Sequence, residues 1–181
     1  MATNDQQVAA DSGKSLTDCP STLYTAEERA KRDSSGWTVV QGVLAPVQFL
    51  VFLVSLGLVL RYLATGEGLS LAIASIVVKT VTLYTIMITG CIWEKVVFGR
   101  YLFAPAFYWE DVFSMLVLGL HTAYLAALAT DSLSTSNLMY LALAAYLAYV
   151  VNAGQFLWKL RMARLDYARQ QAATPNEGLT A

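Results

Sequence analysis

The sequence predicts an all-α protein, an integral membrane bundle of four transmembrane helices with both termini in the cytoplasm. Three observations predict this fold. Of the 181 residues, 56% are hydrophobic and only 14% are charged, whereas about a quarter of the residues in a soluble domain are charged. The polar residues are concentrated at the two ends, in residues 1–36 and 172–181. The apolar middle divides into four runs of about 20 residues or more, the length that a helix needs to cross a bilayer.

The N-terminal region is expected to be a disordered tail, residues 1–22, followed by a short helix in LYTAEERAKRD. In this helix Thr25 can accept a hydrogen bond from the backbone N–H of Glu28, while the Glu28 side chain reaches back to the N–H of Thr25. The first 36 residues contain no apolar core of a secretory signal peptide. The chain is therefore expected to enter the membrane through its internal spans.

The four apolar runs are expected to form spans at about residues 40–63, 69–93, 109–128 and 138–158. They define a membrane domain at residues 23–168, and the polar residues 169–181 after it are expected to form a disordered tail. The connection between the second and third spans, WEKVVFGRYLFAPAFY, is the longest. We expect part of it to be helical along the membrane interface.

Basic residues predict the orientation of these spans. Cytoplasmic flanks and loops of membrane proteins carry an excess of lysine and arginine. Nine basic residues lie on one side of the expected spans: Arg29, Lys31, Arg32, Lys95, Arg100, Lys159, Arg161, Arg164 and Arg169. On the other side stands Arg61 alone. Both termini are therefore expected in the cytoplasm, with the protein in the cytoplasmic (inner) membrane.

The sequence also argues against two classes of function. A net charge of −1 and the lack of a basic stripe argue against nucleic acid as a partner. An ion pore would need a polar path through the outer half of the bundle, where the sequence offers little beyond Thr82 and Tyr124. The chemistry must therefore come from polar groups within or at the edge of the membrane, where such groups are functional candidates by default.

The third span carries the clearest polar pattern. At 100° per residue, Glu110, Ser114 and His121 fall on one stripe, and Tyr124 lies about 40° from it. Asp111 projects about 100° away from Glu110. The stripe predicts a polar face from the cytoplasmic edge to the middle of the membrane. In the alternative interpretation, the two carboxylates are first-turn acids that the helix dipole favours.

His121 and Lys79 are ionisable residues at the expected middle of the membrane. His121 is the only histidine, so the chain cannot supply the two histidines of a b-type haem. Three roles for it stay open: a hydrogen bond to a neighbouring helix, acid–base chemistry, and contact with the magnesium of a macrocycle. Lys79 is expected to pair with a carboxylate or a backbone carbonyl.

Further polar side chains are expected at one depth, near the cytoplasmic leaflet, although they come from different helices: Gln48, Glu94, Glu110, Asn152 and Gln155. Aromatic residues are expected at the same depth: Tyr101, Phe103, Phe107, Tyr108 and Phe113. A pocket of this composition suits a large, flat, mostly apolar ligand that makes a few polar contacts. Hydrogen bonds between helices are the alternative explanation for the amide side chains.

Long stretches of the sequence resemble a known family. They are RDSSGWTVVQGVLAPVQFLVFLVSLGLVLRYLATGEG, IMITGCIWEKVVFGRYLFAPAFYWEDVFSMLVLGLHTAYL and YVVNAGQFLWKLRMARL. These runs are similar to the 2-vinyl bacteriochlorophyllide hydratase family, also called chlorophyllide a hydratase. The resemblance covers about residues 22–168.

The resemblance implies a carbon–oxygen lyase that acts in bacteriochlorophyll biosynthesis of a phototrophic bacterium. Such an enzyme adds water to the C3-vinyl group of chlorophyllide a, or of its bacteriochlorin counterpart, and gives a 1-hydroxyethyl group. The reaction implies no cofactor, because any magnesium arrives within the tetrapyrrole substrate. The preference between chlorin and bacteriochlorin stays open. So does association into homo-oligomers or with other enzymes of pigment biosynthesis.

The chemistry implied by the resemblance requires an acid that protonates the terminal vinyl carbon before water attacks the inner one. Burial beside aromatic rings keeps a carboxyl group protonated near neutral pH. We expect Glu110 to be the proton donor, with Glu94 or Asp111 orienting the water. Asn152 and Gln155 are expected to hold that water or the ring-E carbonyl.

The remaining expected contacts bind the substrate. His121 is the candidate axial contact to the substrate magnesium, directly or through water, and the protein itself is expected to hold no metal. Arg100 or Lys95 is expected to pair with the free propionate of the unesterified pigment. Other expected lining residues are Gln48, Phe107 and Tyr108.

Two alternative functions remain open from the sequence. A pigment carrier or assembly subunit of a photosynthetic complex would have the same pocket and histidine but would need no acid beside the vinyl group. Such a protein would bind the pigment without adding water to it. A small transporter or channel subunit would instead require polar residues that reach both faces of the membrane.

Overall fold

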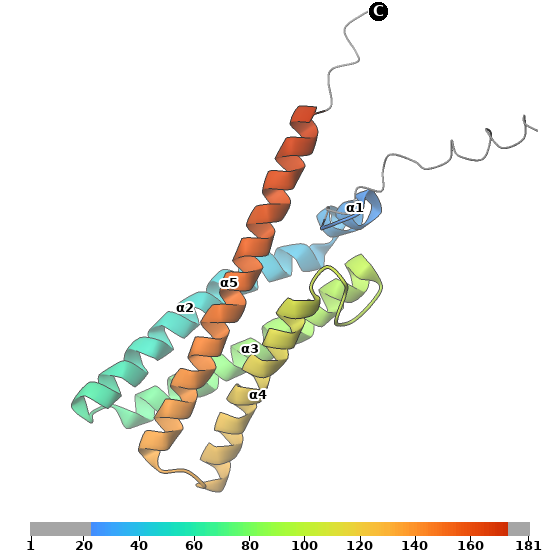
Figure 1. The fold of residues 1–181 in the computed structure, drawn as a ribbon. Coiled ribbons are helices and arrows are strands. Elements are labelled where there is room, and N and C mark those ends of the chain that lie inside the picture. The colour runs from blue at the N-terminus through green and yellow to red at the C-terminus, as the bar shows by residue number, and fades with distance from the viewer. Residues whose placement is uncertain (1–22, 174–181) are drawn as a thin grey trace, which may run out of the picture.

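The computed structural model describes residues 23–173, which form five α-helices (Figure 1). Their bounds are α1 Ala26–Ser34, α2 Gly36–Thr65, α3 Leu69–Phe98, α4 Tyr108–Thr130 and α5 Thr135–Ala173. The described part of the chain contains no strand, and the all-α prediction is confirmed there. Four of the helices are long and apolar enough to cross a membrane, at Gly36–Thr65, Leu69–Phe98, Tyr108–Thr130 and Thr135–Arg169.

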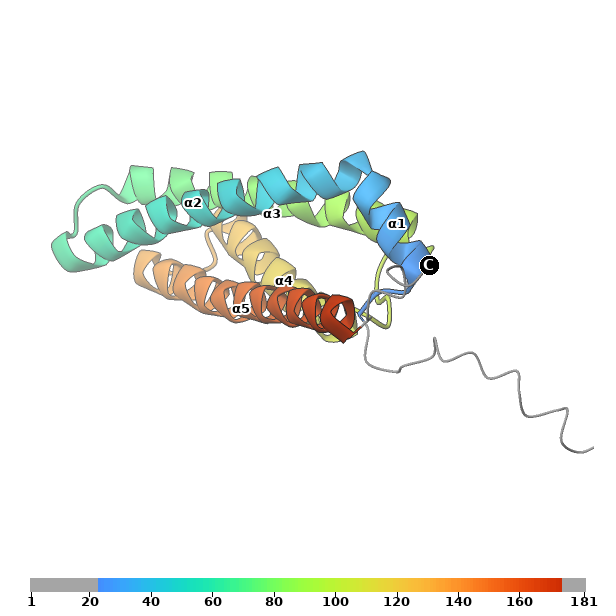
Figure 2. The same ribbon diagram turned by 90° about the horizontal axis from the view of Figure 1, so that it is seen from above.

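The four long helices are arranged as two antiparallel hairpins. Helices α2 and α3 form one pair and α4 and α5 the other, and each pair packs more extensively within itself than against the other (Figure 2). Gly66 and Gly68 both have positive φ angles, 73° and 82°, in the turn between α2 and α3. Glycine adopts this conformation without a steric cost. The two hairpins are joined by the connection at residues 99–107, which lies at the same end of the bundle as α1 (Figure 1).

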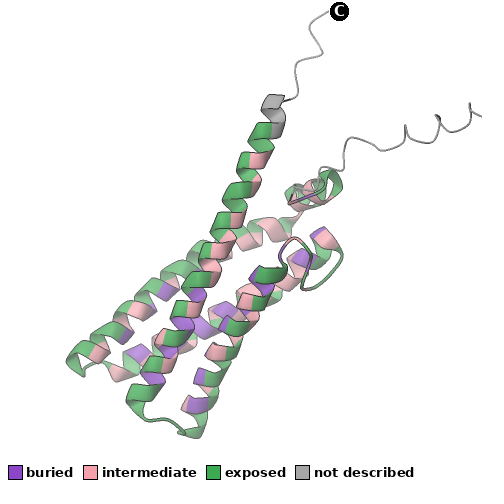
Figure 3. Cartoon of the chain, in the orientation of Figure 1, coloured by how far each residue is buried: buried purple, intermediate pink, exposed green. Residues whose placement is uncertain are grey.

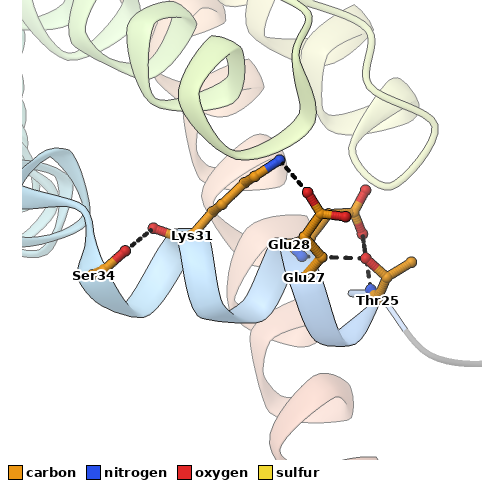
Figure 4. A network of polar contacts seen from close by, with 5 residues as sticks. All are labelled: Thr25, Glu27, Glu28, Lys31 and Ser34. Carbon is orange, nitrogen blue, oxygen red and sulfur yellow. Dashed lines mark hydrogen bonds and ion pairs between the residues drawn. The ribbon is translucent and has the colours of Figure 1, made fainter.

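Helix α1 begins with the expected capping box. The backbone N–H of Glu28 donates to Thr25 Oγ1 at 3.2 Å, and the N–H of Thr25 donates to Glu28 Oε2 at 2.8 Å (Figure 4). Lys31 lies 2.8 Å from Glu27, four residues before it. The hydrogen bond from Lys31 lowers the pKa of Glu27. The prediction of a short capped helix before the first span is confirmed.

Three helices extend beyond the expected spans. Helix α2 begins at Gly36 rather than near residue 40, and α3 continues past Trp93 to Phe98, where Gly99 ends it with a φ of 76°. Helix α5 continues past Trp158 to Ala173. Apolarity marks only the part of a helix that lies in hydrocarbon, and lysine and arginine are good helix formers outside it.

Two expectations about the segments outside the spans have different outcomes. Residues 169–173, expected in a disordered tail, are the end of α5. The tails at residues 1–22 and 174–181 lie outside the described residues. In the long connection at 93–108, the helical part is the end of α3, and it is followed by residues 99–107 without a helix.

Helix α5 is longer than a membrane span needs to be. Its 39 residues correspond to about 58 Å at 1.5 Å per residue, whereas the hydrocarbon of a bilayer is roughly 30 Å thick.

The buried core lies where the two hairpins face each other (Figure 3). Phe52 from α2, Ile76 from α3, Val117 from α4 and Tyr146 from α5 are all nearly inaccessible. Large apolar side chains on the outer faces remain exposed, such as Leu147 at 68%. Apolar residues that are exposed in this way suit contact with lipid, since every backbone polar group of a helix is already bonded internally.

Candidate functional site

A cleft of about 570 Å³ lies between α4 and α5, near the end of the bundle that carries the 99–107 connection. This volume falls within the range of small-molecule pockets, about 300–1,000 Å³. Helix α5 supplies most of the lining because residues three and four apart share one face. The lining residues are Glu110, Gly154, Gln155, Trp158, Lys159 and Met162.

An ion pair joins the two helices across this cleft. Lys159 Nζ donates to Glu110 Oε2 at 2.7 Å. The Glu110 side chain is 9% exposed and that of Lys159 is 24% exposed. The ammonium also lies 5.0 Å from the centre of the Phe107 ring, within cation–π range. The cleft therefore has a carboxylate and an ammonium in contact at its wall.

Two amide side chains on α5 lie at or near the cleft: Gln155 lines it, and Asn152 is one turn before. Asn152 Nδ2 donates to Ser114 Oγ at 2.9 Å, so the stripe on α4 faces α5 at this point. The buried oxygens Asn152 Oδ1 and Gln155 Oε1 have no hydrogen-bond partner among the described residues. Both oxygens are acceptors that a ligand or a water molecule could satisfy.

A second pair of carboxyl groups lies where the 99–107 connection meets α3 and α4. Asp111 and Glu94 are only 3% and 6% exposed. The backbone N–H of Phe103 donates to Asp111 Oδ2 at 2.7 Å, and that of Ala104 donates to Glu94 Oε2 at 3.4 Å. The two carboxyl groups therefore accept from consecutive backbone N–H groups of one connection. Two carboxylates held at one point of the chain disfavour each other's ionised form.

The connection that holds these carboxyls has an unusual backbone. Phe103 has a φ of 57°, which is uncommon for a residue other than glycine and costs about 1–3 kcal/mol. The neighbouring Ala104 is fully buried. Aromatic rings anchor the same segment through stacked and edge contacts: Tyr24, Trp93, Phe98, Phe107 and Phe156. The strained conformation is thus fixed by the two carboxylates and by this aromatic cluster.

His121 lies in the core of the bundle, away from the cleft. It is fully buried, and its Nδ1 lies 2.8 Å from the carbonyl oxygen of Val117. A carbonyl only accepts, so Nδ1 carries the hydrogen and Nε2 has a free lone pair. His121 is eleven residues from Glu110, or about 16 Å along α4. The structure does not bring His121 to the residues that line the cleft.

Two other expected polar residues are also in the core. The ammonium of Lys79 lies 4.0 Å from the centre of the Tyr149 ring, and it has no hydrogen-bond partner among the described residues. The carboxylate or carbonyl partner expected for Lys79 is therefore not found in this part of the chain. Gln48 is 2% exposed, and its amide has no hydrogen-bond partner within residues 23–173.

Of the five polar residues expected at one depth, only Glu110 and Gln155 line the cleft. Among the basic candidates, Lys95 and Arg100 are exposed, and Lys95 Nζ donates to the carbonyl oxygen of Gly99 at 2.9 Å. Tyr108 is 48% exposed beside Phe103 and Trp109. None of these three is a lining residue of the cleft.

The sequence pattern predicts no site role for Lys159, Trp158 or Met162, and Lys159 enters only the prediction of membrane orientation. The spacing nevertheless contained a signal, because Lys159 follows Gln155 by four residues and Met162 follows it by seven, which places them on one helix face. The backbone donors of Phe103 and Ala104 left no signal in the sequence, since any residue other than proline carries an N–H.

Comparisons with known proteins add a relationship. The profile of the family described as 2-vinyl bacteriochlorophyllide hydratase matches residues 24–162. A protein of that name from Cereibacter sphaeroides is 68% identical over 149 residues, which is 82% of this chain and 92% of the relative. Another from Rhodobacter capsulatus is 64% identical over 152 residues, 84% of this chain and 88% of the relative. No solved structure matches the chain.

Proposed function

The chain belongs to the 2-vinyl bacteriochlorophyllide hydratase family, and from this premise we propose how its residues add water to a vinyl group. The protein is a hydratase of bacteriochlorophyll biosynthesis, and its substrate is a bacteriochlorophyllide. The observation that carries the function is the match over residues 24–162, which includes every residue that lines the cleft. The substrate ring lies in that cleft, against Trp158 and Met162. These apolar side chains suit a flat macrocycle.

The proton for the terminal vinyl carbon comes from the pair formed by Glu94 and Asp111. The two groups are shielded from solvent and accept from consecutive backbone N–H groups, and each ionised carboxyl disfavours ionisation of the other. Neither carboxyl is a lining residue of the cleft, but Asp111 directly follows Glu110, which is one, and this position supports the pair as the source of the proton. Glu110, in contrast, forms an ion pair with Lys159, so the geometry favours the other two carboxyls as the acid.

The second half of the reaction needs a base and a positioned water. Protonation leaves positive charge on the inner vinyl carbon, which the macrocycle delocalises, and water then attacks that carbon. Glu110 accepts a proton from this water, because an ionised carboxylate at the cleft wall is a suitable base. Transfer of that proton from Glu110 back to the Glu94–Asp111 pair restores both groups for the next turnover. The amide oxygens of Asn152 and Gln155 hold the water in place, as they have no partner among the described residues.

The bound pigment carries its own magnesium, and the reaction changes no oxidation state, so the proposal includes no cofactor. His121 is not assigned to the magnesium, because it is fully buried and about 16 Å from Glu110 along the helix. An axial contact to the magnesium would use the free lone pair on Nε2 of His121. This atom is buried in the core of the bundle and does not face the cleft.

This function is tested by mixing the purified protein with chlorophyllide a. We expect the lowest-energy absorption band to shift to the blue, because hydration removes the vinyl group from conjugation with the ring. The product should gain the mass of one water molecule, measured by mass spectrometry. A carrier would bind the pigment without a change in mass, and that result would contradict the proposal.

The membrane orientation follows the basic residues. We propose that α1, the 99–107 connection and the C-terminal end of α5 lie on the cytoplasmic side of the inner membrane. The nine basic residues of the cytoplasmic flanks support this orientation. The substrate cleft then opens toward the inner leaflet, where the pigment is made available from the cytoplasm.

Cysteine labelling checks the orientation. In a variant without Cys19 and Cys91, a new cysteine at Ser132, in the turn before α5, should react with a membrane-impermeant maleimide in intact spheroplasts. A cysteine at Glu27, on the exposed face of α1, should react only after the membrane is permeabilised. The reverse pattern would place the termini outside the cytoplasm.

A further inference from the structure

We propose that Lys159 binds the free carboxylate of the substrate and thereby makes the enzyme specific for the unesterified pigment. The inference rests on the proposed function and names the specificity residue of the same site. A chlorophyllide differs from the corresponding chlorophyll in one chemical respect: its propionate side chain ends in a carboxylate instead of an ester. An enzyme that distinguishes the two pigments must therefore recognise a negative charge next to a large apolar ring.

Lys159 has the geometry for this contact. It is the cationic residue in the lining of the cleft, and an ammonium has three N–H donors. Among the described residues its only hydrogen-bond partner is Glu110 Oε2. The side chain is 24% exposed, so the remaining donors are not sealed in the protein. A flexible four-carbon stem also lets the ammonium meet a second carboxylate without losing the first.

None of the other lining residues carries a positive charge that can attract a substrate carboxylate, so its binding in this cleft depends on Lys159. Glu110 carries negative charge at the cleft wall and would repel a substrate carboxylate, and Gln155 is uncharged. Trp158 and Met162 provide apolar contact only. The site thus combines an apolar surface for a ring with an ammonium for an anionic arm. An ester at the end of that arm would gain little from the ammonium and would meet the same apolar surface.

The basic residues that sequence analysis assigned to this role are less suitable. Lys95 is exposed, donates to the carbonyl oxygen of Gly99 at 2.9 Å and lies 5.1 Å from the Tyr101 ring centre. Arg100 is exposed in the connection between the hairpins. On α5 itself, Arg161 and Arg164 are exposed and are not lining residues of the cleft. These four residues provide matched controls, since each is a cation at the same end of the bundle.

The test measures binding apart from turnover. The probes are the 3-ethyl analogue of chlorophyllide a, which has no vinyl group to hydrate, and its methyl ester. Their dissociation constants are measured by quenching of pigment fluorescence in detergent-solubilised protein. The unmodified protein should bind the acid about 10-fold more tightly than the ester, as expected for one partly exposed hydrogen bond between charged groups. In Lys159→Met this preference should disappear, whereas Lys159→Arg should keep it.

Further variants separate recognition from a structural role. Glu110→Gln removes the competing carboxylate, so the preference for the acid should rise above that of the unmodified protein. The double variant Glu110→Gln, Lys159→Met leaves no unpaired charge in the cleft and should bind acid and ester equally. Lys95→Met and Arg100→Met should retain the preference. A structural role for Lys159 would instead weaken the binding of both probes by the same factor.

Two results would overturn this inference. One is an unmodified protein that binds acid and ester equally, and the other is a Lys159→Met variant that still prefers the acid. Neither result affects the hydratase assignment, which the mass gain on chlorophyllide a tests independently. The unmodified protein could fail to hydrate chlorophyllide a while the Lys159→Met variant still loses the preference for the acid. That combination would contradict only the hydratase function.

Discussion

Replacing Asp111 by asparagine is expected to lower kcat for hydration by about 10²- to 10⁴-fold, the usual contribution of a positioned general acid or base. Asparagine has nearly the same shape as aspartate but carries no acidic proton. It therefore cannot share a proton with Glu94 or pass one to the vinyl carbon. The measurement is the initial rate of the blue shift with saturating chlorophyllide a, together with the dissociation constant of the non-hydratable 3-ethyl analogue.

The fold should tolerate this change. The amide oxygen of asparagine can accept the hydrogen bond that the Phe103 N–H donates to Asp111 at 2.7 Å. The positive φ of Phe103 is then still held. We expect the thermal unfolding midpoint and the binding of the analogue to change little, so that the loss appears in kcat alone.

Two further variants show whether the loss in kcat is specific to the carboxyl pair. Glu94→Gln should cause a loss of similar size, because the proton belongs to the pair rather than to one residue. Asp131→Asn is the matched control: Asp131 is an exposed acid at the opposite end of α4, and asparagine tolerates its left-handed conformation. An Asp111→Asn variant with more than a tenth of the normal kcat would show that the proton comes from elsewhere. Glu110 would then be the next carboxyl to test.

The all-α fold could be predicted from the sequence because a membrane restricts which structures a chain can form. A run of apolar residues must form a helix there, since no water is present to bond an open backbone. The positions of the four long apolar helices could therefore be predicted, and so could the buried stripe of Glu110, Ser114 and His121, which depends only on helical periodicity. The ends of the helices could not, because apolarity ends at the edge of the hydrocarbon while α3 and α5 continue beyond it.

The candidate site was only partly predictable because its partners depend on how the helices pack. Periodicity gives the direction of Asp111 on α4, but it does not show that residues 99–107 fold back to place the Phe103 N–H on its carboxylate. Depth along a helix also does not decide which face of the bundle a residue reaches. Gln48 and Gln155 were expected together, yet Gln48 is in the core and Gln155 lines the cleft.

Replacing Phe107 by alanine is expected to lower the free energy of unfolding by about 3–5 kcal/mol, the usual cost of truncating a buried phenylalanine. Phe107 is 2% exposed. Its ring centre lies 5.8 Å from those of Trp93, Phe98 and Phe156, and 6.2 Å from that of Tyr24. The residue therefore joins α3, α5 and the segment before α1 at the end of the 99–107 connection.

Activity should fall with stability in this variant. Without the Phe107 ring, the connection loses the contact that holds the Phe103 and Ala104 backbone against Asp111 and Glu94, and the ammonium of Lys159 loses the ring 5.0 Å from it. Denaturant unfolding in detergent measures the stability, and proteolysis within residues 99–107 measures the opening of the connection. Phe49→Ala is the control, since Phe49 is 47% exposed on α2 and lipid or detergent can fill the space. Equal losses in the two variants would mean that the aromatic cluster does not anchor the connection, and the carboxyl pair would then have to be held by its two backbone hydrogen bonds alone.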